Sequence, residues 1–420
     1  MSSPVDLFAH AEPLEPEAMG AGTLDAMGGR FDITRVSLRN YRGLGQCDVA
    51  LGPLTVLVGP NGSGKSNFVD SLRFMSQALD ESLDNALRER GGIDEVRRRS
   101  TGHPRHLSVK VWFRGRDFAG AYEFEIGAVR GKDYRVTREE CTVKHASFGV
   151  PDAHYRVRAG VLEASSVSAV LPAPADDRLY LVLASALPEF RPVFEGLSAI
   201  DVYNLNPGLM RQPQRPDAGD LLRRDGSNIA SVLEHLRRTA PDAKPLIEEY
   251  LSRIVPGVVS ADRRDLGAYE TIEFRQDVAG AAAPWSFPAT SMSDGTLRAL
   301  GILVALFAPG ANGYSPIGIE EPETALHPAA AGTLLEAIES ASRRRQVIVT
   351  SHSPEMLDSP TLKPESLLAV RADAGVTRVA PLDEAAADAL RTSLFTAGEL
   401  LRVDQLQPSD VDQPELDLFT

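Results

Sequence analysis

The sequence contains only two cysteines, Cys47 and Cys141, among 420 residues. Two cysteines this far apart provide neither a disulfide framework nor the clustered spacing of a structural zinc site. The most apolar segment, 299–308, has about half the length that a membrane-spanning helix needs. The N-terminus lacks the basic start and apolar core of a signal peptide. We therefore expect a cytoplasmic protein without a membrane partner.

Basic residues are absent from both ends of the chain. Residues 1–29 and 403–420 each hold five of the 58 acidic residues and none of the 44 basic ones. The body between them is close to neutral, so its composition does not demand a nucleic-acid partner. We expect a disordered acidic tail over 1–30, a folded body over 31–402, long enough for two lobes, and an acidic tail over 403–420.

Hydrophobic periodicity predicts an α/β fold. Alternating apolar residues over 106–158 indicate an antiparallel β subdomain. Helical spacing at 229–236, after caps at Asp225 and Ser227, and at 245–254 indicates a helical lid within an insert of about 160–288. From 296 to 370 helices alternate with apolar strands, which indicates a parallel sheet covered by helices. No heptads are sustained, so no long coiled coil is expected.

A glycine-rich loop supplies the strongest chemical signal. It follows the apolar run Leu54–Val58 and opens a helix, and it reads GPNGSGKS. In such a loop backbone N–H groups cradle phosphates, the lysine reaches the terminal phosphates and the serine hydroxyl binds Mg²⁺. The chain has only six lysines, which makes a chance match rare. The predicted nucleotide-binding residues are Gly59, Pro60, Asn61, Gly62, Ser63, Gly64, Lys65, Ser66 and Asn67.

Two later strands end in residues that suit the same reaction. Glu320 and Glu321 follow an apolar strand, where the first would hold Mg²⁺ through water and the second would act as general base. His352 follows the next apolar strand, where it could donate a hydrogen bond to the γ-phosphate. Adjacent acids at a solvated strand end, and a histidine without a role, are the alternative interpretations.

A second anion site is predicted at SMSDGT, residues 291–296. Ser293, Gly295 and the first N–H groups of the following helix could bind a phosphate. Alone, this pattern is only a helix N-cap. Beside a complete phosphate loop, it suggests a site for the γ-phosphate held by a second subunit.

The order of these motifs resembles that of the ABC-type ATPases of the RecF, SMC-like and OLD-related group. The resemblance covers about 31–402 and rests on RVSLRNYRGL, GPNGSGKSN, MSDGT, IEEPETALHP and TSHSPEML. It implies an ATPase head that dimerises around two ATP molecules. Each site would then combine one subunit's Lys65, Ser66, Glu320, Glu321 and His352 with Ser293 and Gly295 of the other.

The sequence departs from that family at several positions. Asp294 and Thr296 replace the usual Gly and Gln or Glu of the signature, and Glu320 replaces the usual Asp. His327 stands where many relatives have an Asp, and no glutamine loop is evident because Gln77 lies too early. The sequence lacks, after the phosphate loop, the N-K-x-D motif that recognises a guanine base. We therefore expect ATP with Mg²⁺, hydrolysed slowly.

The remaining features leave the biology open. The resemblance implies DNA repair, DNA maintenance or anti-phage defence, with a separate effector such as a nuclease. Alternatives are a non-catalytic ATP-sensing scaffold and, less well supported, a transporter's ATPase subunit. Arginine runs at 97–99 and 343–345 fit solvated helix ends. The resemblance also implies that the first run could line a DNA-facing groove or sense the γ-phosphate. The last residues resemble a sliding-clamp peptide through Gln413, Leu416, Leu418 and Phe419, although chance or docking onto the chain's own body is the favoured explanation.

Overall fold

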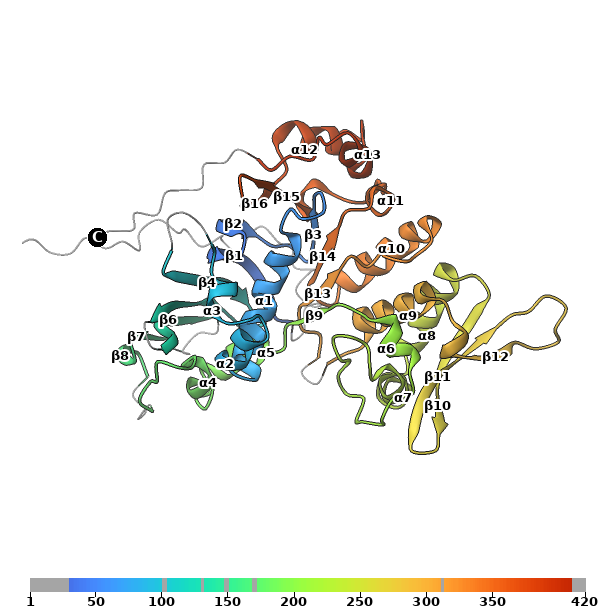
Figure 1. Ribbon diagram of the computed structural model, residues 1–420, viewed down its shortest axis with the longest axis horizontal. Helices are drawn as coiled ribbons and strands as arrows, with labels where there is room; N and C mark the ends of the chain where they lie inside the picture. The colour runs from blue at the N-terminus through green and yellow to red at the C-terminus, as the bar shows by residue number, and fades with distance from the viewer. Residues whose placement is uncertain are drawn as a thin grey trace, which may run out of the picture.

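The computed structural model describes residues 30–99, 104–129, 132–146, 151–167, 172–310 and 313–409. The predicted N-terminal tail and the clamp-like peptide lie outside these residues. Thirteen of the described strands form one sheet, in the order β8-β7-β6-β5-β4-β1-β2-β16-β15-β3-β14-β13-β9 (Figure 1). Its strands are β1 (Asp32–Tyr41), β2 (Leu44–Ala50), β3 (Leu54–Val58), β4 (His106–Arg114), β5 (Phe118–Val129), β6 (Lys132–His145), β7 (Ala153–Arg158), β8 (Val161–Ser165), β9 (Asp201–Tyr203), β13 (Ile317–Glu320), β14 (Val347–Ser351), β15 (Leu367–Asp373) and β16 (Val376–Pro381).

One half of this sheet is parallel. Strands β15, β3, β14, β13 and β9 run in the same direction. Side chains of β3 alternate between two hydrophobic cores: Val56 and Val58 face one, and Leu57 faces the other. A strand buried on both faces needs a continuous apolar run, which β3 and β14 have. The predicted parallel sheet is confirmed.

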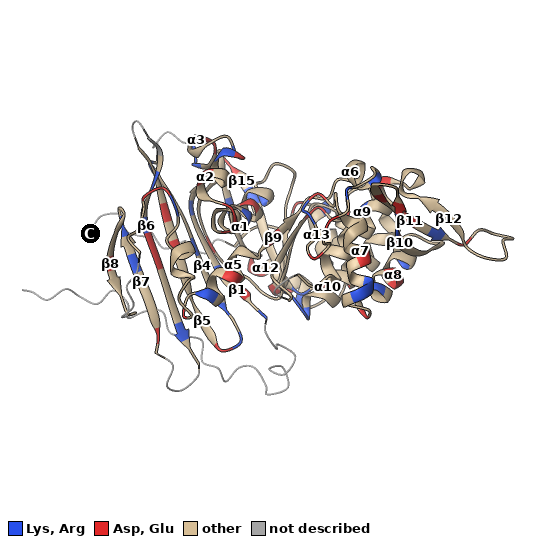
Figure 2. Cartoon of the chain, turned by 90° about the horizontal axis from the view of Figure 1, so that it is seen from below, with Lys and Arg blue, Asp and Glu red and all other residues tan. Residues whose placement is uncertain are grey.

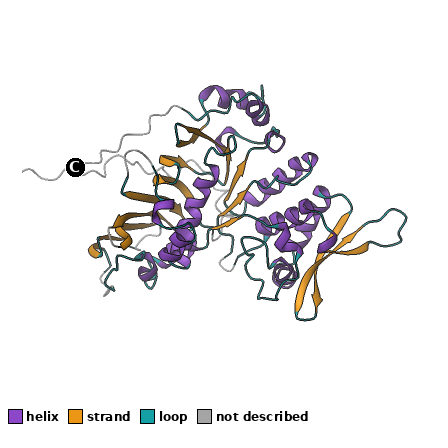
Figure 3. Cartoon of the chain, viewed as in Figure 1, coloured by secondary structure: helices purple, strands orange, loops and turns teal. Residues whose placement is uncertain are grey.

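The other half is antiparallel and continues the same sheet. Strands β4 to β8 pair in succession, which confirms the predicted meander, and β1 pairs with both β2 and β4. The halves join through β16, which pairs with β15 on one side and with β2 on the other. Figure 3 shows helices beside this half; they include α1 (Lys65–Asp80), α2 (Leu83–Arg88), α3 (Ile93–Val96), α4 (Leu181–Ala184) and α5 (Arg191–Ser198).

A second lobe is mainly helical. It contains α6 (Pro207–Arg211), α7 (Ile229–Thr239), α8 (Ala243–Ile254), α9 (Asp294–Phe307), α10 (Ala331–Ser342) and a small sheet of β10 (Val258–Leu266), β11 (Tyr269–Gln276) and β12 (Trp285–Pro288). The apolar faces predicted for α7 and α8 are largely buried in its core. The predicted caps were wrong: Asn228 is the N-cap of α7, and Asp225 accepts from the Ser227 amide instead. The longest described helix, α1, has 16 residues, so the described chain contains no long coiled coil.

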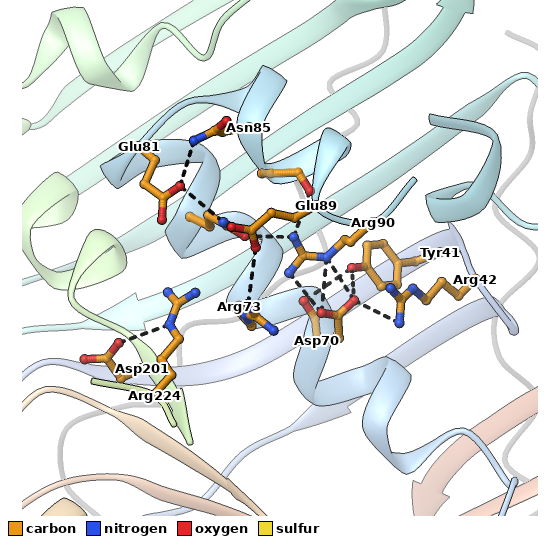
Figure 4. A network of polar contacts seen from close by, with 12 residues as sticks. Tyr41, Arg42, Asp70, Arg73, Glu81, Asn85, Glu89, Arg90, Asp201 and Arg224 are labelled. Carbon is orange, nitrogen blue, oxygen red and sulfur yellow. Dashed lines mark hydrogen bonds and ion pairs between the residues drawn. The ribbon is translucent and has the colours of Figure 1, made fainter. Parts of the chain in front are cut away.

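Helix α1 is fixed by a buried carboxylate. Asp70 accepts hydrogen bonds from the Tyr41 hydroxyl (2.7 Å) and the Arg90 guanidinium (2.9 Å) and pairs with Arg42 (3.2 Å) (Figure 4). Burial would raise the pKa of Asp70, but the hydrogen bonds and charges of Arg90, Arg42 and Tyr41 together outweigh it, and the pKa is lowered. Gln77 accepts from the same Arg90, so it serves this network. The phosphate loop therefore opens a helix tied to β1 and to the segment after α2.

The C-terminal helices α11 (Pro354–Leu357), α12 (Glu384–Arg391) and α13 (Ala397–Arg402) complete the described chain. The arginine run 343–345 is only partly a solvated helix end, because Arg345 is buried. Its guanidinium donates to three carbonyls, those of Ala305, Ala308 and Ser315. Both cysteines are buried and free. Among the described helices none has the length and apolarity to cross a bilayer.

Candidate nucleotide-binding site

The sheet register brings the three predicted segments together. Strand β14 lies between β3 and β13, with Ser351 paired to Val58 and Thr350 paired to Glu320. Because all three strands are parallel, their carboxyl ends lie at one edge of the sheet. The phosphate loop, the acidic pair and His352 follow these ends and therefore meet there.

The phosphate loop is shaped by strands from the far end of the chain. Gly59 and Gly64 have φ of 156° and 103°, which glycine adopts most readily. A Cβ on Gly59 would lie 2.1 Å from the Val370 carbonyl oxygen, and one on Gly64 would lie 2.3 Å from the Thr377 hydroxyl. Strands β15 and β16 thus support the loop. Nothing in the sequence indicated this, because Thr377 is far along the chain from the loop.

The predicted nucleotide-contacting side chains are partly exposed. Pro60, Asn61, Gly62 and Ser66 are exposed, Gly64 and Asn67 are half-buried, and Gly59, Ser63 and Lys65 are buried. The Lys65 ammonium donates to the carbonyls of Gly59 (2.8 Å) and Pro60 (3.0 Å). Burial lowers the pKa of Lys65, and the charges of Glu321 and Glu323 oppose that shift.

Glu320 lies against the phosphate loop. Burial raises the pKa of its carboxyl group, and a hydrogen bond from the Ser66 hydroxyl opposes the increase. A hydroxyl and a carboxylate in contact offer the hard oxygen ligands that Mg²⁺ prefers. The described residues contain no cluster of three or more His, Cys, Asp or Glu side chains that could hold a metal. The Ser66–Glu320 pair suits Mg²⁺ bound jointly by protein and phosphate oxygens.

Glu321 and His352 are side by side. The Glu321 carboxylate lies 3.3 Å from His352 Nδ1. Glu321 has a φ of 43°, unusual for a residue other than glycine. The turn is held by its amide, which donates to the Thr350 carbonyl (3.1 Å), and by Arg298 of α9, which donates to the carbonyls of Glu320 (3.0 Å) and Glu321 (3.1 Å). Sequence reasoning missed Arg298, which follows residues 291–296, here called the signature-like turn, by only two residues.

Sequence reasoning also assigned no role to Glu323. One of its carboxylate oxygens accepts from the Ser351 hydroxyl (2.7 Å) and from the His352 amide (3.3 Å). Its side chain is 9% exposed. As one acid among three in the segment 320–323, it gave no separate signal.

The signature-like turn lies at the start of α9. Ser293 is the N-cap and accepts from the Thr296 amide (3.1 Å), so the cap interpretation holds within this subunit. Asp294 pairs with Arg211 of α6 (2.5 Å). Gly295 touches the chain after β13, because a Cβ there would lie 2.4 Å from the Ala325 carbonyl oxygen.

Two family models match the chain. One, described as "AAA ATPase domain", matches residues 32–114, which include the phosphate loop. The other, described as "AAA domain, putative AbiEii toxin, Type IV TA system", matches residues 198–358, which include the signature-like turn, the acidic pair and His352.

Several solved structures that resemble the chain in fold are SMC head domains. One is an SMC head bound to the C-terminal winged-helix domain of ScpA, with a TM-score of 0.51 and 15% identity over 85% of this chain and 99% of that one. The family models thus match AAA-type ATPase domains in two parts of the chain, and this solved structure shows that the fold resembles an SMC head. Another is the SMC head of Pyrococcus furiosus bound to the C-terminal domain of ScpA, with a TM-score of 0.49 and 13% identity over 87% and 99%. The SMC-like head fold, with its mixed sheet and antiparallel subdomain, agrees with the predicted fold class.

Proposed function

We propose that this SMC-like head binds ATP with Mg²⁺ and hydrolyses it. One observation supports the proposal above others. Lys65, the Ser66–Glu320 pair and the Glu321–His352 pair converge at a single edge of the sheet. Ser66 and Glu320 would hold Mg²⁺, which supplies charge neutralisation at the phosphates.

The other side chains have roles that follow from their surroundings. Lys65 would exchange two carbonyl acceptors for the terminal phosphates, a stronger charge-assisted contact. The Glu321 carboxylate would accept a proton from the attacking water, and His352 beside it would donate a hydrogen bond to the γ-phosphate. Glu320, longer than the usual aspartate, would alter the placement of the metal shell, which accords with slow turnover.

We also propose that two heads close on ATP. Ser293 and Gly295 lie at the N-terminal turn of α9, where unpaired N–H groups and the helix dipole favour an anion. Asp294 would repel a phosphate at this turn. Its pairing with Arg211 offsets that charge, which keeps the turn suitable for a γ-phosphate from the partner subunit.

For the biological setting we propose defence or DNA maintenance with a separate effector. The description of the family model over 198–358 favours a toxin–antitoxin setting as the second candidate. Two arginines of the first basic run, Arg97 and Arg99, pair with Asp94 and Glu95. The strands of the antiparallel half carry both charges (Figure 2), in a chain of ion pairs that links Lys110, Glu123, Arg138, Glu140 and Arg156. Any DNA contact is therefore better sought elsewhere on the head.

Glu321→Gln tests the enzymatic proposal. The variant keeps the shape of the side chain but not its basicity, so phosphate release should fall at least tenfold while ATP binding persists. Sedimentation with ATP should then give a dimer, and Lys65→Ala, which weakens phosphate binding, should stay monomeric. Unchanged phosphate release in Glu321→Gln would refute the role of this residue. A variant that loses turnover but keeps its full biological effect would support the ATP-sensing scaffold.

The clamp contact is a separate proposal that rests on sequence. A peptide of residues 408–420 should bind a bacterial sliding clamp by calorimetry and lose binding on Leu418→Ala with Phe419→Ala, since these apolar anchors would fill its pocket. No measurable heat and no competition with a known clamp peptide would dispose of it.

A further inference from the structure

The turn that presents His352 is held by a carboxylate outside the acidic pair. Glu323 Oε1 accepts from the Ser351 hydroxyl at 2.7 Å and from the His352 amide at 3.3 Å. The Ser351 hydroxyl in turn accepts from the Ser353 amide at 3.1 Å. Ser353 is the N-cap of α11, where its hydroxyl accepts from the Met356 amide. Glu323 thus begins a chain of hydrogen bonds that runs through the whole turn.

This carboxylate lies in a setting that makes its bonds stronger than surface ones. The Glu323 side chain is 9% exposed, and its charge acts on two nearby cations, Lys65 and Arg298. Hydrogen bonds to an ionised acceptor are roughly twice as strong as neutral ones, and the 2.7 Å bond from the Ser351 hydroxyl has the short length of this class, whereas the bond from the His352 amide is longer. A neutral side chain of the same length could accept at Oε1 but would lack that charge.

The same carboxylate also lies near the ring of His352. Nδ1 of that ring is 3.3 Å from Glu321 and 4.0 Å from Glu323 Oε1. The turn whose backbone is bonded to Glu323 thus also carries the imidazole that lies beside Glu321.

We propose that Glu323 is a positioning residue that fixes the Ser351–Ser353 turn and thereby holds His352 beside Glu321. Its effect on turnover rests on the proposed function; its effect on the turn does not. Glu323 is not the base in this scheme, because its contacts go to the turn and Glu321 is the acid next to the imidazole.

Hydrogen exchange without nucleotide tests the positioning directly. Glu323→Ala should raise the exchange rate of the 352 and 353 amides about tenfold, because one loses its acceptor and the other loses its fixed partner. Ser351→Ala should expose the 353 amide while leaving the 352 amide protected by Glu323. Glu321→Ala, which removes the neighbouring acid, should leave both amides unchanged. Equal protection in Glu323→Ala and the wild-type protein would overturn the proposal.

A double-mutant cycle on ATP turnover tests the route of the effect. Glu323→Gln should lower kcat about tenfold with the KM for ATP within about twofold of wild type, since its bond to the turn weakens while the phosphate loop is intact. In a His352→Ala background the same change should cost nothing further. A full additional loss there would mean that Glu323 acts independently of His352, which would refute the proposal. If the wild-type protein shows no ATP turnover but Glu323→Ala still speeds exchange of the 352 and 353 amides, the enzymatic proposal is refuted and the positioning of the turn by Glu323 stands.

Discussion

Gly295→Ala probes the contact between the signature-like turn and the chain after β13. An added Cβ would lie 2.4 Å from the carbonyl oxygen of Ala325. Backbone must move to relieve that overlap, and overpacking of this kind costs about 1–3 kcal/mol. Alanine gains about 0.5–1 kcal/mol over glycine in a helix, so the net loss is at most about 2.5 kcal/mol. With an unfolding entropy of about 0.8 kcal/mol/K for a chain of this size, Tm should fall by up to roughly 3 °C.

The chain offers a matched control for this experiment. Gly332 occupies the second position of α10, as Gly295 does in α9, and a Cβ on Gly332 would meet nothing within 4 Å. Gly332→Ala should therefore raise Tm by about 1 °C. Differential scanning calorimetry gives the Tm of both variants. Because both gain the same helix propensity, their difference in Tm reports the steric overlap with Ala325 alone. If Gly295→Ala is as stable as Gly332→Ala, the contact with Ala325 does not constrain the turn and the reasoning fails.

Two further predictions concern the supports of the site. Asp70→Asn should destabilise the protein most above about pH 4, the ordinary pKa of an aspartate. The pKa of Asp70 is lowered in the folded protein, so its stabilisation is present above that pH and is lost as pH falls through the folded pKa. Urea unfolding at a series of pH values should show the stability curves of variant and wild type converging in acid, and parallel curves would contradict the prediction. Arg345→Met should cost about 2–4 kcal/mol in urea unfolding, because three carbonyls lose their donor. The exposed neighbour provides its control, since Arg344→Met should change stability by less than about 0.5 kcal/mol.

The sequence was sufficient for the elements whose signal is local. The apolar runs of β3 and β14 and the helical spacing of α7 and α8 identified these elements because burial requires those periods. The phosphate loop, Glu320, Glu321 and His352 could be predicted to lie at one sheet edge because each stands at the end of such a run, and parallel strands bring their carboxyl ends together.

Contacts between distant segments could not be predicted in this way. Nothing local distinguishes Thr377 as the residue against Gly64, or Arg345 as a buried donor beside two exposed arginines. Glu323 was hidden for a related reason, since its partners belong to the next strand and its own segment holds two acids with more familiar positions. The β16 junction, which unites the parallel and antiparallel halves, likewise depends on tertiary pairing alone.

The segment from Glu320 to Ala325 is the place where these contacts meet. Arg298 of α9 donates to the carbonyls of Glu320 and Glu321, and Ala325 lies against Gly295. Glu323 accepts a hydrogen bond from the His352 amide. Glu321 and Ala325 both have positive φ, at 43° and 65°, and such strained conformations persist only when their surroundings fix them. A movement of the N-terminus of α9 would therefore reach Glu321 through the Gly295–Ala325 contact and the Arg298 side chain. If two heads close on ATP as proposed, this short segment would couple the position of Glu321 to a phosphate bound at the start of α9.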